Sequence, residues 1–308
     1  MTNLPYETFL EAPGPLGPLK GTLLSSSPNP ENIILIVPGS GPTDREGNNP
    51  LGVNAGTYRL LAEGLAKKGK AVLRIDKRGM FGSSSAVMDA NSVVLKDYVD
   101  DIRSWLIILN RRFNTKCVWL LGHSEGGIVT LASAQENQIS GIILVATPSR
   151  PLSEVLRHQF KTNLEDATLQ TLGGKVIDAL EQGQYIDVEN MPPVLQSIFN
   201  PSVQGFLIDL FTYNPSQMIE AVTKPILILQ GERDIQVDKN NAGELAAANP
   251  GATVVMFPDT NHVLKPVTSD NRQENIAAYT DPSLPLAPGI VDAISQFLSK
   301  NAGNISPE

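Results

Sequence analysis

The sequence predicts an α/β fold in which a doubly wound, mostly parallel sheet carries helices on both faces and receives one helical insertion. Three observations predict it. Short apolar runs of strand length alternate with segments of helical spacing between residues 33 and 146. The alternation stops over residues 147–223, where helical patterns follow one another, and then resumes. The 308 residues also fit one core of about 200–250 residues plus one insertion.

The elements of the core follow in order from these patterns. Glycine and proline in the first 30 residues mark the turns of a hairpin of edge strands. The strands of the parallel sheet are expected at residues 33–37, 71–75, 118–122, 142–146, 226–230 and 253–257. The helices of the core are expected at residues 58–68, 95–110, 127–135, 240–248 and 290–298. The core therefore comprises residues 1–146 and 224–308.

Residues 147–223 are predicted to form a helical cap. Pro201 and Pro215 punctuate its helices, and Gly173 and Gly174 are expected to mark a turn. The segment is rich in Leu, Ile, Val and Phe, so its helices must bury one face. Because it leaves the core at the carboxyl edge of the sheet, where doubly wound folds bind ligands, we expect it to line the substrate pocket.

Composition excludes several classes of protein. A net charge of −8 and a pI near 5.0 argue against a nucleic-acid partner and an anionic membrane surface. No apolar run approaches the roughly 18 residues of a membrane-spanning helix. The one cysteine, Cys117, is interpreted as a buried structural thiol. The first residues lack the pattern of a signal peptide, which favours a cytoplasmic protein, although a mature secreted or periplasmic form would read the same way.

The segment LLGHSEGG, residues 120–127, joins an expected strand to an expected helix. It contains the pattern G-x-S-x-G, which places a serine on a sharp strand-to-helix turn with its hydroxyl at the carboxyl edge of the sheet. The pattern alone is weak, because an ordinary glycine-rich turn can match it, but the strand before it and the helix after it are what the chemistry requires. Ser124 is therefore the predicted nucleophile.

Three histidines compete for the role of base. His123 is adjacent to Ser124 on the turn, so its side chain is expected to point away from the hydroxyl. His158 lies on the first helix of the insertion, where a solvated role is expected. His262 lies in the loop at residues 258–266, after the last strand, and it satisfies the chain order serine, acid, histidine. His262 is the predicted base.

The acid that orients this base should follow the strand at residues 226–230. Asp234 lies in the turn directly after that strand and is the predicted acid. Glu232 and Asp238 are the nearby alternatives, and Asp259 is closer to the base in sequence but follows a different strand. The acid fixes the tautomer of the imidazole and stabilises the imidazolium.

The loop after the first parallel strand reads PGSGPTDREGN, residues 38–48. In this kind of site one oxyanion donor comes from that loop and the other from the residue after the nucleophile. The predicted donors are the backbone N–H groups of Ser40 and Glu125. The Glu125 side chain is expected to form a salt bridge at the pocket wall.

These motifs resemble the α/β-hydrolase superfamily and, within it, bacterial carboxylesterases with a PGSGPTDRDGN-like loop. Here Glu46 stands in place of the usual aspartate. Further matches are DKRG at residues 76–79, GHSEGG, SRPL, GERD and NHVLK, which span residues 33–266. The resemblance implies the α/β-hydrolase fold, ester hydrolysis through an acyl-enzyme, a helical cap, and a bracing role for Asp76 and Arg78.

The predicted function is therefore hydrolysis of small or medium apolar carboxylic esters, with a small-molecule ester as the binding partner. No cluster has metal-ligand spacing, so no metal or cofactor is expected. Peptidase, thioesterase, acyltransferase and carbon–carbon hydrolase activities stay open on the same triad, because the fold does not settle the substrate. A non-catalytic ligand-binding protein is the alternative from a different class. The sequence leaves the oligomeric state open.

Overall fold

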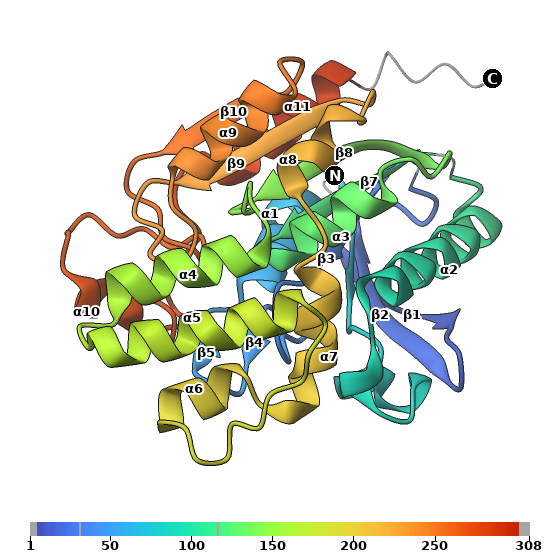
Figure 1. Cartoon of the computed structure of the whole chain (residues 1–308). Helices are drawn as coiled ribbons and strands as arrows, with labels where there is room; N and C mark the ends of the chain where they lie inside the picture. Colours follow the sequence, from blue (N-terminus) through green and yellow to red (C-terminus); the bar gives the residue numbers. More distant parts are fainter. Residues whose placement is uncertain (1–4, 31, 116, 302–308) are drawn as a thin grey trace.

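The computed structural model describes residues 5–30, 32–115 and 117–301 (Figure 1). Within these residues eight strands form one sheet in the order β1-β2-β6-β3-β7-β8-β9-β10. From β6 to β10 neighbouring strands are parallel, and the hairpin of β1 and β2 adds antiparallel to β6. The predicted fold class and edge hairpin are confirmed. The bounds are β1 (Tyr6–Pro13), β2 (Pro18–Ser25), β3 (Asn32–Val37), β6 (Ala71–Ile75), β7 (Cys117–His123), β8 (Ile139–Val145), β9 (Ile226–Gly231) and β10 (Thr253–Phe257).

Helices cover both faces of the sheet, because successive strand residues point to opposite faces. On β3, for example, Leu35 packs into one hydrophobic cluster and Ile36 into the other. The first cluster lies under α2 (Leu95–Phe113), α3 (Glu125–Ser133), α8 (Pro215–Glu220) and α9 (Asn240–Ala248). The second lies under α1 (Thr57–Lys67) and α11 (Ile290–Asn301). The core is thus a three-layer sandwich with the sheet in the middle.

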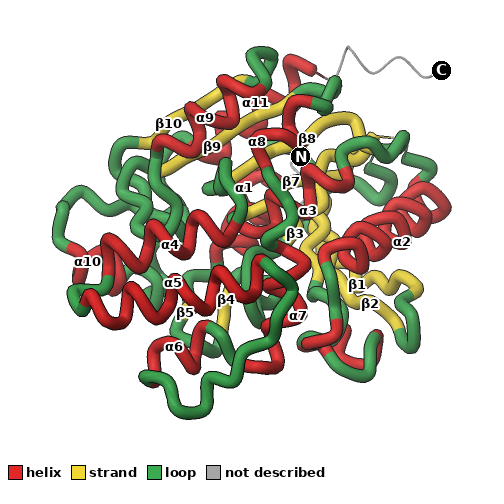
Figure 2. Tube along the Cα trace, in the orientation of Figure 1, coloured by secondary structure: helices red, strands yellow, loops and turns green. Residues whose placement is uncertain are grey.

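The segment between β8 and β9 is helical, and its described residues contain no strand (Figure 2). Its helices are α4 (Leu152–Asn163), α5 (Ala167–Glu181), α6 (Pro193–Ile198), α7 (Pro201–Leu210) and α8. The first four lie together on one side of the sheet (Figure 1) and share a hydrophobic cluster of their own, which includes Phe160, Ile177 and Phe199. The last helix, α8, packs instead on the core through Ile219.

The predicted turn at Gly173 and Gly174 is wrong, because both residues lie inside α5. Glycine weakens a helix but does not end it when tertiary packing compensates. A Cβ on Gly173 would collide with the ring of Phe160 on α4, so the missing side chain lets the two helices approach. Gly174 faces open space and has no such role.

Several short elements were not predicted. They are the ribbon of β4 (Asn48–Asn49) and β5 (Val53–Asn54), the helix α10 (Arg272–Ala277), and two 3₁₀ helices, η1 (Phe81–Ala86) and η2 (Ala90–Ser92). Each is six residues or shorter, and such lengths carry too few turns or alternations to show a period in sequence.

Candidate active site

Ser124 lies between β7 and α3, on the strand-to-helix turn. Its φ of 55° and ψ of −124° form a backbone conformation that residues with a side chain rarely adopt. Two hydrogen bonds hold it: its N–H donates to the Val145 carbonyl at 2.8 Å, and its carbonyl accepts from the Gly127 N–H at 2.9 Å. A strained conformation persists only where the surroundings impose it, and such residues cluster at functional sites.

Gly122 and Gly126 are needed for this turn to close. A Cβ on Gly122 would collide with the carbonyl oxygen of Gly126, and a Cβ on Gly126 would collide with the carbonyl oxygen of Val37. The two glycines therefore let α3 pack directly onto the ends of β7 and β3. This packing aligns the start of α3 with the loop after β3.

The loops after β9 and β10 bring Asp234 and His262 together. The Nδ1 atom of His262 lies 2.8 Å from Oδ2 of Asp234. The other carboxylate oxygen accepts the backbone N–H groups of Gln236 and Val237 at 2.8 and 2.9 Å. Since the carboxylate accepts, Nδ1 carries the proton, and Nε2 of the neutral ring is left as an acceptor. This is the tautomer that a general base for a serine hydroxyl needs.

The other candidate acids have different surroundings. Glu232 pairs with Lys239 at 3.5 Å. Asp238 accepts the Asn240 N–H at 2.8 Å, next to the start of α9. The Asp259 side chain is exposed. Of the four acids considered, Asp234 is the one that the described structure places against the imidazole.

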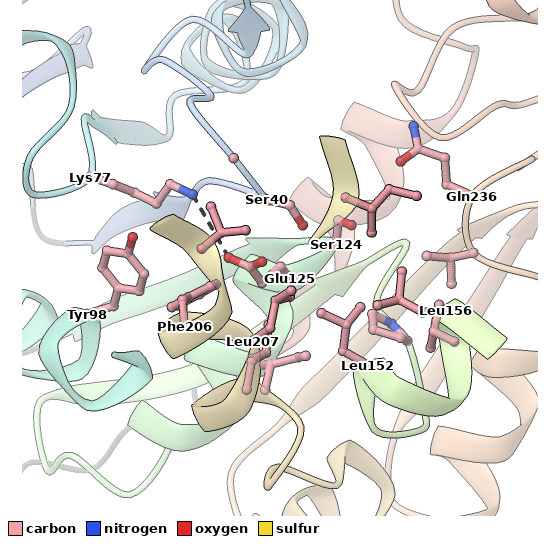
Figure 3. A pocket seen from close by; sticks show the side chains of 18 of the residues that line it. Ser40, Lys77, Tyr98, Ser124, Glu125, Leu152, Leu156, Phe206, Leu207 and Gln236 are labelled. Atoms are coloured by element: carbon pink, nitrogen blue, oxygen red, sulfur yellow. Dashed lines mark ion pairs between the residues drawn. The ribbon is translucent and has the colours of Figure 1, made fainter. Parts of the chain in front are cut away.

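Two cavities meet at Ser124 and Ser40, which line both. The smaller, of about 110 Å³, is also lined by His262. The larger has about 330 Å³ and contacts Glu125 and Lys77 on one side (Figure 3). Much of the remaining wall is apolar and comes from the insertion. These side chains are Leu152, Val155, Leu156, Ile198, Val203, Phe206, Leu207 and Leu210. The site can therefore hold an apolar group on one side of a scissile bond and a smaller group on the other.

Two backbone N–H groups flank the nucleophile. Ser40 follows β3, and within the described chain its N–H has no protein acceptor. Glu125 is the first residue of α3, where N–H groups have no partner within the helix. A pair of such donors beside a nucleophile is what a developing oxyanion requires.

A buried chain of hydrogen bonds joins the Ser40 loop to the His262 loop. The Gly39 N–H donates to the Tyr58 hydroxyl at 2.9 Å, that hydroxyl lies 3.0 Å from Nδ1 of His123, and Nε2 of His123 lies 2.9 Å from the His262 carbonyl oxygen. The donor and the acceptor of each hydrogen bond follow from the atoms involved. A carbonyl only accepts, so Nε2 of His123 donates to it, and Nδ1 of the neutral ring accepts from Tyr58. Burial lowers the pKa of His123 to about 3, which keeps the ring neutral.

Replacing His123 with glutamine is expected to weaken the dependence of stability on pH. An unfolded histidine takes up a proton below its ordinary pKa of 6.5, whereas burial holds the pKa of folded His123 near 3. Between these values protons favour unfolding, so the free energy of unfolding falls as pH falls, by at most about 1.4 kcal/mol per pH unit for one group. Urea unfolding across this range should give a shallower slope for His123→Gln than for the parent. Exposed His158 supplies the control: His158→Gln should keep the parent slope, and identical slopes for all three proteins would contradict the argument.

Asp76 and Arg78 follow β6 and brace two neighbouring segments. Asp76 accepts the backbone N–H of Arg45 at 2.9 Å and its Nε–H at 3.0 Å, which fixes the loop after β3. Arg78 donates from Nε and Nη2 to the Asp101 carboxylate at 2.8 and 2.7 Å, which fixes α2. The bracing role that the sequence resemblance implied agrees with these contacts.

Glu46, the residue that departs from the usual pattern of this loop, is also held. Its carboxylate pairs with the buried guanidinium of Arg74 on β6, and its carbonyl accepts the Tyr58 N–H at 3.1 Å. Burial raises the pKa of Glu46. The glutamate thus ties the loop to both β6 and α1.

Lys77 was not predicted to take part in the site. Its Nζ donates to the Gly39 carbonyl oxygen at 2.7 Å and lies 4.0 Å from the Glu125 carboxylate, so the salt bridge expected for Glu125 has Lys77 as its partner. The sequence did contain one signal, a charged triplet directly after an apolar strand, but nothing in it showed what the lysine reaches.

Other expectations concern residues away from this site. Cys117 is half-buried at the amino end of β7, which corrects the expectation of a buried thiol. Among residues 5–30, 32–115 and 117–301 no three His, Cys, Asp or Glu side chains are grouped so that they could hold a metal ion. Over the same ranges, no helix combines the length and apolarity needed to cross a membrane.

Parts of this sequence are similar to known proteins. Residues 51–187 match the family model described as serine aminopeptidase, S33. The chain is 28% identical over 264 residues to esterase EstD of Thermotoga maritima, a match that covers 84% of this chain and 61% of that protein. The chain thus spans about three fifths of the length of this curated relative.

Solved structures share the fold at lower identity. The Pyrococcus furiosus esterase Pf2001 matches with a TM-score of 0.57 and 15% identity, over 96% of this chain and 92% of that one. An esterase from Thermogutta terrifontis matches with a TM-score of 0.58 and 19% identity, over 96% and 99% of the two chains. At these identities the likeness concerns the fold.

Proposed function

We propose that this chain, which has the α/β-hydrolase fold, is a serine carboxylesterase with Ser124 as nucleophile, His262 as base and Asp234 as the orienting acid. One observation carries the proposal. A serine held at a strained strand-to-helix turn lines the same cavity as an imidazole that a buried carboxylate orients. The similarity to esterase EstD supports it.

These assigned roles imply the following reaction. Nε2 of His262 takes the proton of the Ser124 hydroxyl as its oxygen attacks the ester carbonyl. The N–H groups of Ser40 and Glu125 receive the negative charge on the former carbonyl oxygen. His262 then gives the proton to the departing alcohol. Water attacks the acyl-enzyme by the same route, which releases the acid and restores the serine.

Ester substrates fit the larger cavity better than peptides with a free amino terminus. An aminopeptidase needs a negative charge to receive the substrate ammonium. Among the described residues that line this cavity, the one carboxylate is that of Glu125, and Lys77 balances its charge. The apolar walls from α4, α6 and α7 instead favour an uncharged acyl group. We therefore propose that residues 147–223 act as the cap that selects the ester.

The direct test combines a fluorophosphonate probe with a substrate panel. The probe should modify Ser124, as located by peptide mass spectrometry, and aryl esters of short to medium acyl chains should be hydrolysed faster than an aminoacyl anilide or a thioester of matched acyl group. Faster cleavage of the anilide would favour an aminopeptidase. Failure of the probe to modify Ser124 would refute the serine mechanism and favour a non-catalytic binding protein.

Substitution of Phe206 by alanine is expected to change the acyl preference. Phe206 lines the larger cavity from α7, so the variant should favour longer acyl chains. The ratio of kcat/KM for a longer ester to that for a shorter one should rise by roughly 10-fold, since one methylene in an apolar pocket is worth about 1–3 kcal/mol.

Val176→Ala is the matched control for this experiment. Val176 is buried in the hydrophobic cluster of the insertion but does not line the cavity. Its truncation should lower the melting temperature without changing the ratio. If both variants changed stability alone, the insertion would be a scaffold and not a specificity element.

A further inference from the structure

The peptide group between Gly39 and Ser40 is held by the side chain of Lys77. Its carbonyl oxygen, which belongs to Gly39, accepts a hydrogen bond from Nζ of Lys77 at 2.7 Å. Its N–H belongs to Ser40 and is one of the two donors proposed for the oxyanion. In a planar trans peptide the C=O and the N–H point in opposite directions. An interaction that fixes the carbonyl therefore also fixes the direction of the Ser40 N–H.

We propose that Lys77 is a positioning residue for the oxyanion hole: its ammonium holds the Gly39 carbonyl so that the Ser40 N–H faces the oxygen of the acyl group on Ser124. The inference rests on the proposed function, because it assumes that Ser124 forms the acyl-enzyme. The inference adds Lys77 to the oxyanion hole as a residue that contacts neither Ser124 nor His262.

The position of Gly39 supports this role. A Cβ placed on Gly39 would lie 3.2 Å from the carbonyl oxygen of His123 and 3.4 Å from Cβ of Ser124. The peptide that Lys77 holds therefore lies directly against the nucleophile. On its other side, the Gly39 N–H donates to the Tyr58 hydroxyl. Gly39 is held at both its N–H and its carbonyl, by side chains from two separate parts of the chain.

The surroundings of Lys77 stabilise its ammonium group in a buried position. Its side chain is 5% exposed, and such burial lowers the pKa of Lys77. The Glu125 carboxylate, 4.0 Å from Nζ, opposes this effect. The Tyr98 ring centre lies 5.6 Å from Nζ, in the range of a cation–π contact. A buried charge without compensation is costly, so this arrangement indicates that the ammonium serves a purpose at this point.

This arrangement also gives the side chain of Glu125, the residue after the nucleophile, a role in the site. Figure 3 shows its carboxylate facing the Lys77 ammonium at one end of the cavity, with Ser40 and Ser124 beside them. Its backbone N–H is one proposed oxyanion donor, and its side chain stabilises the lysine that orients the other. Glu125 is thus linked to both proposed oxyanion donors, because it supplies one of them and stabilises the lysine that orients the other.

Lys77→Met is the variant that tests the proposal, because methionine keeps the length of the side chain and removes the ammonium. The peptide would then be free to turn, and kcat for an aryl ester should fall by roughly 10- to 100-fold, less than the roughly 10²–10³-fold cost of losing an oxyanion donor outright. KM should change little, because the interaction acts on the transition state. The affinity for phenylboronic acid, which forms a tetrahedral adduct with the serine, should fall by a similar factor.

Lys224→Met is the matched control. Nζ of Lys224 also donates to a backbone carbonyl, that of Glu136, but neither residue lines the two cavities at Ser124. This variant should lose stability while its kcat, counted per site titrated by the fluorophosphonate, and its boronate affinity stay as in the parent. If Lys77→Met does not fold, Lys77→Gln, which keeps an N–H donor on a shorter side chain, replaces it, and an intermediate loss of kcat and boronate affinity is expected.

The outcomes separate this inference from the function on which it rests. Parent-like kcat and boronate affinity in the Lys77 variant would overturn the positioning role and leave the esterase proposal intact. Equal losses in the Lys77 and Lys224 variants would also overturn it, since the effect would then be structural. A parent protein that neither hydrolyses esters nor binds the boronate would refute both.

Discussion

Replacing Ser124 with alanine is expected to lower kcat for an aryl ester by roughly 10³-fold or more while leaving the fold intact. The hydroxyl makes no hydrogen bond to another side chain in the described chain, so its loss leaves no buried group unsatisfied. The backbone bonds from Ser124 to Val145 and Gly127 do not involve the side chain and should persist. Steady-state kinetics and a thermal melt of the same preparation measure the two parts of this expectation.

Ser133→Ala is the control for that experiment. Ser133 lies on the same helix, α3, and its buried hydroxyl also has no partner among the described residues, but it does not line the cavities at Ser124. This variant should retain the parent kcat and the fluorophosphonate adduct. Near-normal turnover in Ser124→Ala would mean that another residue performs the attack.

Asp234→Asn is expected to lower kcat by about 10⁴-fold, the cost of fixing the imidazole in the wrong tautomer. The structure explains why an amide has this effect here. The backbone N–H groups of Gln236 and Val237 donate to one oxygen of Asp234, so the amide oxygen of an asparagine would take that side. Its NH₂ group would then face Nδ1 of His262. The imidazole would carry its proton on Nε2 and could not accept the proton of Ser124.

Glu232→Gln and Asp238→Asn are the matched controls, because each also removes one negative charge from the same loop region. Glu232 pairs with Lys239, and Asp238 accepts a bond next to the start of α9, so both changes should leave kcat close to that of the parent. Measurement of kcat for the three variants at one pH decides the assignment. If Asp238→Asn lost its activity and Asp234→Asn kept it, the acid would be Asp238.

The fold was predictable because its main elements are long enough to show a local period. The strand predicted at residues 253–257 matches β10, and the helix predicted at residues 240–248 matches α9. The chain order of serine, acid and histidine also names residues that the structure brings to one edge of the sheet. Loop ends of parallel strands meet at that edge wherever they fall in sequence. Asp259 also follows such a strand, so chain order favoured Asp234 only as the acid after the preceding strand, and the structure places Asp234 against His262.

The parts that could not be predicted depend on contacts between distant segments. Lys77 reaches Gly39, which is 38 residues away in sequence, and His123 reaches the His262 carbonyl across 139 residues. No local pattern encodes such a pair. The wrong turn at Gly173 has the same cause, since the ring of Phe160 on another helix decides that a glycine is useful there. Tertiary packing overrides local propensity at these positions.

The triplet Asp76, Lys77 and Arg78 has a consequence for how this molecule can vary in evolution. Its three consecutive side chains reach two segments: Asp76 and Lys77 hold the loop after β3 at Arg45 and Gly39, and Arg78 holds helix α2. Surface loops usually accept insertions and deletions, but one residue added here would move all three side chains out of register with their partners at once. In the insertion after β8, by contrast, α4 to α7 share a hydrophobic cluster of their own. Length changes can therefore accumulate more readily in the insertion than in the segment that follows β6.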